Sequence, residues 1–203
     1  MNRSWIAAAL AVGAIASPAR SQNLLANPDF DTAQQLAGWL ETGTWSSDDF
    51  AGDPSSGSVR VATSSPVATT VLLRQCVGAA SGASFDFSAE VRVASGQSPG
   101  SARLAVAFWD TPDCSGTESD AVGYFQSSAA PTTGDWSPVA SSAVAPALTQ
   151  SALMELAVSK GVAGGSLAAY FDHVSLPEPG AALAPAAALA VLCALARWRV
   201  AQG

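Results

Sequence analysis

The chain has 203 residues, a formal net charge of −7 and a sequence pI of about 4.4, and this length is enough for one domain with its own core. Of the nine basic residues, Arg3, Arg20, Arg197 and Arg199 lie near the two ends of the chain, whereas all sixteen carboxylates lie within residues 22–179. The central part is therefore strongly acidic and repels phosphate backbones, which excludes nucleic acid as a partner. The negative charge does not exclude divalent cations or neutral molecules as ligands.

Residues 1–21 have the order of parts of an export signal. A single early positive charge, Arg3, precedes the short apolar run WIAAALAVGAIA and then a stretch of small residues. This order is typical of a secretory signal peptide that is cleaved after Ala16 or after Ser21. The alternative is a buried N-terminal helix.

The chain has three cysteines, of which Cys193 lies in an apolar run near the C-terminus. The exported part therefore carries one pair, Cys76 and Cys114. An even pair in an oxidising compartment predicts a disulfide, with two free thiols as the alternative. A zinc site is not expected, because no further Cys or His stands close to either residue.

Period-two alternation dominates the middle of the chain. In residues 83–93 one face is apolar, and it consists of Phe85, Phe87, Ala89, Val91 and Val93. Residues 101–110 repeat the pattern, with Leu104, Val106 and Phe108 inward and Arg103 and Trp109 outward. Further strands are expected within residues 57–63, 67–77, 121–127, 136–144, 152–159 and 166–176, with turn-forming clusters between them. Many short strands separated by turns predict an antiparallel β-sandwich.

Three segments carry a family resemblance. The opening NLLANPDFDTAQQLAGW, the segment SSGSVRV and the closing AAYFDHVSL resemble, in this order, the galactose-binding-like jelly rolls that include many carbohydrate-binding modules. Between them, LRQCV, ASGQSPGSARLAVAFWD and DCSG resemble exported bacterial versions of the same sandwich. The resemblance covers residues 23–176. It implies an all-β jelly roll of two sheets over residues 22–176, with its first and last strands close together.

The resemblance also implies a calcium site, because in this family a cation often joins the opening segment to the last strand. The matching positions are Asp31 and Asp172. Alternation along residues 166–176 places Asp172 inward, with Tyr170 and Leu176, and a buried carboxylate needs a partner. Calcium takes oxygen ligands, but backbone hydrogen bonds to Asp172 are an equal alternative. The sole histidine, His173, is expected to be a partly exposed strand residue and not a catalyst.

Glycan binding is the function that the resemblance implies for a sheet face. Trp109 is the candidate platform, because the apolar face of a sugar stacks on an aromatic ring. Arg103 shares its strand face, and the preceding strand is expected to supply Glu90 and Arg92. The alternative is that Trp109 packs beneath a loop. No catalytic residues are predicted, because the candidate carboxylates for glycoside hydrolysis lie in turn-like stretches.

Residues 177–203 combine Pro177-Glu178-Pro179, a short apolar run, and the basic residues Arg197 and Arg199. The run is shorter than the roughly 20 residues that span a bilayer. The order resembles the PEP-CTERM sorting signal of Gram-negative bacteria, in which an apolar helix holds the protein in the inner membrane and basic residues stay in the cytoplasm. The resemblance implies that an exosortase cuts near the tripeptide. An ordinary C-terminal membrane anchor is the alternative.

The sequence therefore predicts an exported, non-catalytic β-sandwich, flanked in the precursor by a signal helix and a C-terminal hydrophobic helix. We expect it at the cell surface or in the extracellular matrix, in contact with polysaccharide. The alternatives are a structural or adhesion protein that binds other proteins, and a carbohydrate-active enzyme.

Overall fold

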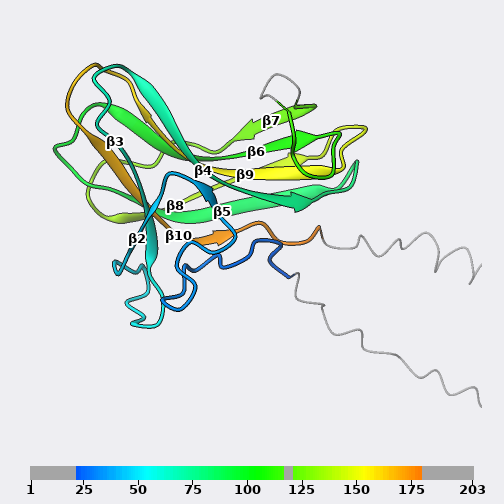
Figure 1. Ribbon diagram of the computed structural model, residues 1–203, viewed down its shortest axis with the longest axis horizontal. Helices are drawn as coiled ribbons and strands as arrows, with labels where there is room; N and C mark the ends of the chain where they lie inside the picture. Colours follow the sequence, from blue (N-terminus) through cyan, green and yellow to red (C-terminus); the bar gives the residue numbers. More distant parts are fainter. Residues whose placement is uncertain (1–21, 117–120, 180–203) are drawn as a thin grey trace, which may run out of the picture.

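The computed structural model describes residues 22–116 and 121–179. The predicted signal peptide, the C-terminal apolar run, Arg197 and Arg199 lie outside these residues. The described residues form ten strands and no helix. Figure 1 shows how these strands are arranged. In this part of the chain, accordingly, no helix is long and apolar enough to cross a bilayer.

The strands form two five-stranded sheets in which every pair is antiparallel. The β9 sheet has the order β1 (Leu40–Glu41), β4 (Thr69–Gly78), β9 (Ser151–Lys160), β6 (Gly100–Trp109) and β7 (Gly123–Gln126). The β10 sheet has the order β2 (Thr44–Ser46), β3 (Ser58–Thr63), β10 (Leu167–Ser175), β5 (Ser84–Val93) and β8 (Trp136–Val144). Every predicted strand is present. The short strands β1 and β2 were not predicted, because two or three residues show no period.

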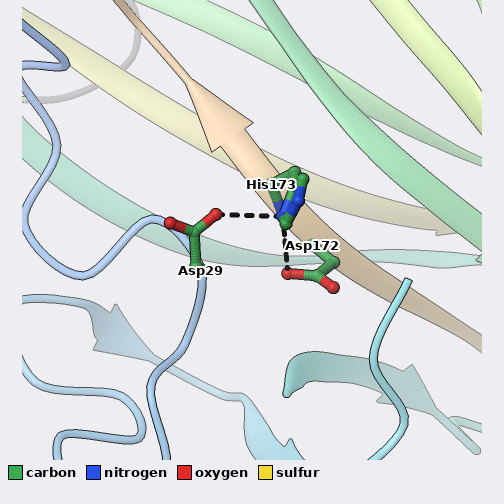
Figure 2. A group of neighbouring side chains, drawn as sticks. All are labelled: Asp29, Asp172 and His173. Carbon is green, nitrogen blue, oxygen red and sulfur yellow. Dashed lines mark hydrogen bonds and ion pairs between the residues drawn. The ribbon is translucent and has the colours of Figure 1, made fainter. Parts of the chain in front are cut away.

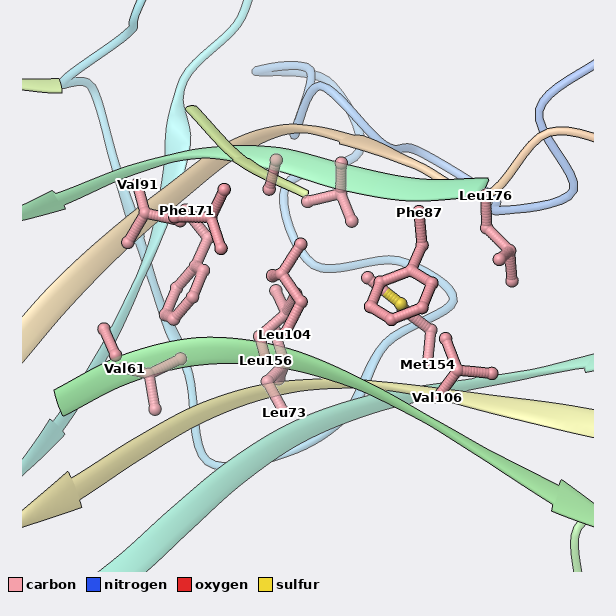
Figure 3. Close-up of a cluster of buried hydrophobic side chains, with 14 of the residues drawn as sticks. Val61, Leu73, Phe87, Val91, Leu104, Val106, Met154, Leu156, Phe171 and Leu176 are labelled. Carbon is pink, nitrogen blue, oxygen red and sulfur yellow. The ribbon is translucent and has the colours of Figure 1, made fainter. Parts of the chain in front are cut away.

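The core lies between the two sheets (Figure 3). Phe87 and Phe171 from the β10 sheet pack against Leu104, Met154 and Leu156 from the β9 sheet, and all five side chains are fully buried. Burial of each such side chain stabilises the fold by roughly 2 kcal/mol. The predicted inward faces of β5 and β6 are confirmed.

The predicted alternation along β10 is wrong at Tyr170 and Asp172, and it is right at Val174 and Leu176, which are buried in the core. Phe171 packs in the core, so Tyr170 faces outward, where its ring lies 4.6 Å from the guanidinium of Arg92. The register of β10 against β5 then shifts between Asp172 and Ser175, and His173 adopts a φ of 47°. Such a bulge moves all later side chains to the other face. Asp172 precedes this bulge and lies on the outer side with Tyr170, where it is buried against the loop that contains Phe50.

The two ends of the described chain lie side by side. Asn23 forms a β-bridge with Pro177, and the Leu24 amide donates a hydrogen bond of 2.9 Å to the Leu176 carbonyl. In Figure 1 the blue opening segment accordingly runs beside the orange end of β10. The expected closeness of the first and last segments is confirmed.

Candidate functional site

The outer face of the β9 sheet is hollowed. Its centre carries small side chains, since Ala157 on β9 lies between Leu72 on β4 and Arg103 on β6 in the strand register. Longer side chains stand on β4 and on the edge strand β7. The result is a pocket of about 610 Å³, lined by Thr70, Leu72, Arg74, Arg103, Tyr124, Gln126 and Ala157.

A buried carboxylate organises the walls of this pocket. Glu155 lies on β9 directly opposite Arg74, and its side chain is fully buried. The Arg74 Nε lies 3.1 Å from Glu155 Oε1, and the Tyr124 hydroxyl donates a hydrogen bond of 3.0 Å to Glu155 Oε2. One carboxylate therefore holds a side chain from each wall. The Tyr124 ring remains 44% exposed, so that it borders the hollow with an open aromatic surface.

Arg103 contributes a second guanidinium. Its Nη2 donates a hydrogen bond of 3.3 Å to the Ser159 hydroxyl, whereas its Nε is covered and has no hydrogen-bond partner among the described residues. The pocket thus combines an exposed ring with two guanidinium groups and the Gln126 amide. Planar polar groups beside an aromatic ring suit a ligand that has an apolar face and hydrogen-bonding edges.

Trp109 does not serve this pocket as an exposed platform, and that prediction is wrong. Its side chain is only 2% exposed and packs with Ala107 and Leu153, beside the disulfide between Cys76 and Cys114. The disulfide prediction is confirmed: β4 supplies Cys76, the turn after β6 supplies Cys114, and their Cα atoms lie 6.0 Å apart. The alternative, that Trp109 packs beneath a loop, is correct.

Glu90 and Arg92 lie on the opposite side of the molecule from Arg103. Although β5 and β6 follow one another in the chain, β5 pairs with β8 and β10, and β6 pairs with β7 and β9. Arg92 instead forms an ion pair with Asp48 at 2.5 Å and packs 5.2 Å from the ring of Trp136. The expected grouping of Glu90 and Arg92 with Trp109 is therefore wrong.

A group of charged side chains surrounds the β10 bulge (Figure 2). His173 Nδ1 lies 3.0 Å from Asp29 Oδ1 and 3.6 Å from Asp172 Oδ1. Asp172 accepts hydrogen bonds from the Phe50 amide at 2.8 Å and from the His173 amide at 2.7 Å. Burial raises the pKa of Asp172 to about 6, although these two backbone donors act in the opposite direction. The expected backbone alternative for Asp172 is thus present.

Of the two predicted calcium ligands, Asp172 belongs to a cluster of possible metal ligands, and Asp31 does not. Asp29, and not the exposed Asp31, is the carboxylate of the opening segment that lies near Asp172, and the ligand atoms of Asp29, Asp172 and His173 lie within 4.8 Å of one another. Two carboxylates and an imidazole suit an ion that accepts nitrogen, whereas calcium takes six to eight oxygen ligands. Calcium at this place stays a prediction.

The tripeptide Pro177-Glu178-Pro179, which is predicted to be a sorting motif, begins where the sandwich ends. Pro177 is paired with Asn23, and the amide of the exposed Glu178 donates a hydrogen bond of 2.7 Å to the Gln22 carbonyl. Pro179 is the last residue that the structure describes. The tripeptide is therefore attached to the domain without a linker.

Arg74 and Tyr124, which line the hollow, and Glu155, which lies beneath it, were not predicted as site residues. Glu155 is the one charge within the apolar stretch ALMELAV, and such a charge needs a buried partner, so a signal existed. No comparable sequence signal pointed to Tyr124 as a site residue, because it lies on the edge strand β7, which has only four residues.

No family model matches the chain, and no curated protein matches it. Solved structures do resemble it. They include the enzymatically active domain of tailspike protein 4 of bacteriophage CBA120, with a TM-score of 0.57, 14% identity and 77% of this chain covered. The CBM22-1 xylan-binding domain of Xyn10C from Paenibacillus barcinonensis has a TM-score of 0.52, 16% identity and 80% coverage. A family 16 carbohydrate-binding module has a TM-score of 0.50, 13% identity and 77% coverage.

The extent of these matches differs. The chain spans 21% of the tailspike structure, but 98% of the xylan-binding domain and 100% of the family 16 module. At this level of identity, the likeness establishes the fold. The described domain is thus a β-sandwich of the kind found in carbohydrate-binding modules.

Proposed function

We propose that this protein is a non-catalytic carbohydrate-binding protein whose ligand lies in the hollow of the β9 sheet. The observation that carries the proposal is the Tyr124 ring, which is 44% exposed and is held at the edge of an alanine-floored pocket by its bond to Glu155. A pyranose ring has an apolar face that stacks on such a ring. Its hydroxyl groups can accept hydrogen bonds from Arg74, Arg103 and Gln126.

The fold supports this proposal. Two of the similar structures are described as a xylan-binding domain and a carbohydrate-binding module, and this chain covers nearly the whole of each. We extend that activity to this chain because its sheet carries a pocket of suitable size and chemistry. A pocket of about 610 Å³ falls in the range of small-ligand sites.

The side chains of the pocket favour binding without catalysis. Glycoside hydrolysis uses a pair of carboxyl groups on either side of the scissile bond. None of the described residues that line the hollow is a carboxylate. Glu155 lies beneath them, buried and bonded to Arg74 and Tyr124, so it cannot reach a bound sugar.

Export and sorting complete the proposal. Residues 1–21 would direct the chain out of the cytoplasm, and an exosortase would recognise Pro177-Glu178-Pro179 while Arg197 and Arg199 remain on the cytoplasmic side. The mature domain would then work at the cell surface or in the extracellular matrix of a Gram-negative bacterium. Polysaccharide is the ligand that such a place offers.

The test uses a glycan array followed by calorimetry on the domain and two variants. Tyr124→Ala removes the exposed ring, and we expect at least about tenfold weaker binding, since stacked aromatic contacts and their buried area are worth more than 1 kcal/mol. Phe50→Ala is the matched control, because Phe50 is 42% exposed but lies against Trp136 and His173 of the other sheet. An equal loss of glycan affinity in Tyr124→Ala and Phe50→Ala would contradict the proposed site. Absence of any glycan binding by the wild type would favour the structural matrix protein instead.

A further inference from the structure

The few basic side chains of this acidic domain differ in their partners and in their exposure. Residues 22–179 hold five basic side chains, those of Arg60, Arg74, Arg92, Arg103 and Lys160, and all sixteen carboxylates of the chain. Lys160 is buried, where its ammonium group donates hydrogen bonds to the carbonyl groups of Ser65, Gly164 and Gly165. Arg92 is paired with Asp48, and Arg60 is exposed on the outer face of the β10 sheet. The remaining two cations both line the hollow.

The two cations differ in the carboxylates that the described residues place near them. Arg74 is paired with Glu155 at 3.1 Å. Within the described residues, no carboxylate forms an ion pair with Arg103, whose hydrogen-bond partner is the uncharged hydroxyl of Ser159. Because Nε of Arg103 is covered, its guanidinium faces the hollow through the Nη nitrogens.

The local charge of the hollow is therefore opposite to the charge of the domain. The Arg74–Glu155 pair sums to zero, and Arg103 adds one positive charge at the pocket wall. A half-buried charge of this kind interacts more strongly with an anion than an exposed one does, because less water screens it. A guanidinium also matches a carboxylate geometrically, through two parallel hydrogen bonds.

We infer that the hollow selects a glycan that carries carboxylate-bearing sugars, with the carboxylate at Arg103 and a neighbouring sugar ring on Tyr124. This inference rests on the proposed carbohydrate-binding function. The acidic groups of the glycan must be sparse, because the negative field of the whole domain repels a dense polyanion. A polysaccharide in which single uronic acids are separated by neutral sugars meets both conditions.

The experiment uses an array of uronate-bearing and neutral microbial polysaccharides. Each uronate-bearing member is also printed after its carboxyl groups have been reduced to alcohols. We expect the wild type to bind a uronate-bearing glycan at least about tenfold more tightly than its reduced form. Arg103→Gln is expected to bind both forms equally, at the level of the reduced form. Arg103→Lys retains the charge and restores part of the preference.

Arg60→Gln is the matched control, because it changes the net charge by the same amount as Arg103→Gln but removes an arginine of the other sheet. It should leave the preference unchanged. Equal binding of native and reduced glycans by the wild type, or an equal effect of Arg60→Gln, would overturn the inference and leave carbohydrate binding intact. If the wild type binds neither form, or if Tyr124→Ala binds as the wild type does, the proposed function itself fails.

Discussion

The hydroxyl of Tyr124 donates a hydrogen bond to Glu155, and the same buried carboxylate is paired with Arg74 on the far side of β9. The bond joins the edge strand β7 to the centre of the sheet across β6. The two walls of the hollow are thus held by one buried side chain. The shape of the pocket depends on Glu155, although Glu155 does not line it.

Replacement of Glu155 by glutamine tests this dependence. The amide keeps an acceptor for Tyr124 but loses the charge that pairs with Arg74, which is left half-buried without its carboxylate. We expect the free energy of unfolding to fall by roughly 2 kcal/mol, because the loss of one partner of a buried pair leaves the other uncompensated. Glycan affinity should fall as well. Urea denaturation and calorimetry measure the two effects.

Tyr124→Phe is the control for Glu155→Gln. It removes the hydroxyl alone, keeps the exposed ring and leaves the Arg74 pair in place, so a loss of about 1 kcal/mol is expected. A Glu155→Gln protein that unfolds and binds like the wild type would contradict the organising role of the carboxylate.

The disulfide gives a second prediction. Cys76 and Cys114 are separated by 38 positions, and in the chain-entropy model a cross-link over such a loop stabilises the folded state by roughly 4 kcal/mol. The double variant Cys76→Ala/Cys114→Ala should therefore unfold at much lower urea. Dithiothreitol should lower the stability of the wild type and leave the variant unchanged. An equal response of both proteins to the reductant would show that the bridge does not stabilise the domain.

Much of the fold could be predicted from local pattern. Alternation gave the inward faces of β5 and β6, because a half-buried strand must place every second side chain in the core. It failed at His173, where a positive φ and a register shift invert the faces, and no residue type announces a bulge there. The phase of a strand cannot be extended through such a point.

The site was less predictable, because it depends on which strands are neighbours. Arg103 was correctly expected on the outer face of β6, but Glu90 was placed beside it on the assumption that consecutive strands pair. Whether an outward ring is exposed depends on distant segments. Trp109 and Tyr124 both lie on the outer face of the β9 sheet; Cys114 and Ala121 pack against Trp109, which is 2% exposed, whereas Tyr124 is 44% exposed.

The ends of the mature protein form a third prediction. Gln22 is hydrogen-bonded to Glu178, so the segment that follows the predicted export signal lies beside the segment that precedes the C-terminal apolar run. Mass spectrometry of protein recovered from the native cell surface should give an N-terminus after Ala16 or Ser21 and a C-terminus near Pro177–Pro179. An intact C-terminus would contradict sorting and support the membrane anchor. Glu178→Ala should abolish C-terminal cleavage, whereas Asp135→Ala, an exposed acid in the loop before β8, should not.

The fourth prediction concerns Asp172 and pH. Its pKa is raised from 3.8 to about 6 in the folded protein, chiefly because burial disfavours the charged form. Between pH 4 and pH 6 the folded state therefore holds a proton that the unfolded state releases. Stability must fall as pH rises through this window, by roughly 3 kcal/mol for this group. Above about pH 6 the contribution is constant, because both states are then deprotonated.

Asp172→Asn removes this titration. We expect the wild type to lose stability relative to this variant as the pH rises from 4 to 7. Urea denaturation of both proteins in the presence of chelator measures the two free energies of unfolding. Asp113→Asn is the control: hydrogen bonds from Ser115 lower the pKa of the exposed Asp113, so its titration lies below this range. A constant difference between wild type and Asp172→Asn would contradict the raised pKa. Calcium added at pH 7 should raise the melting temperature of the wild type alone if the predicted ion binds there, because its ligands must be ionised.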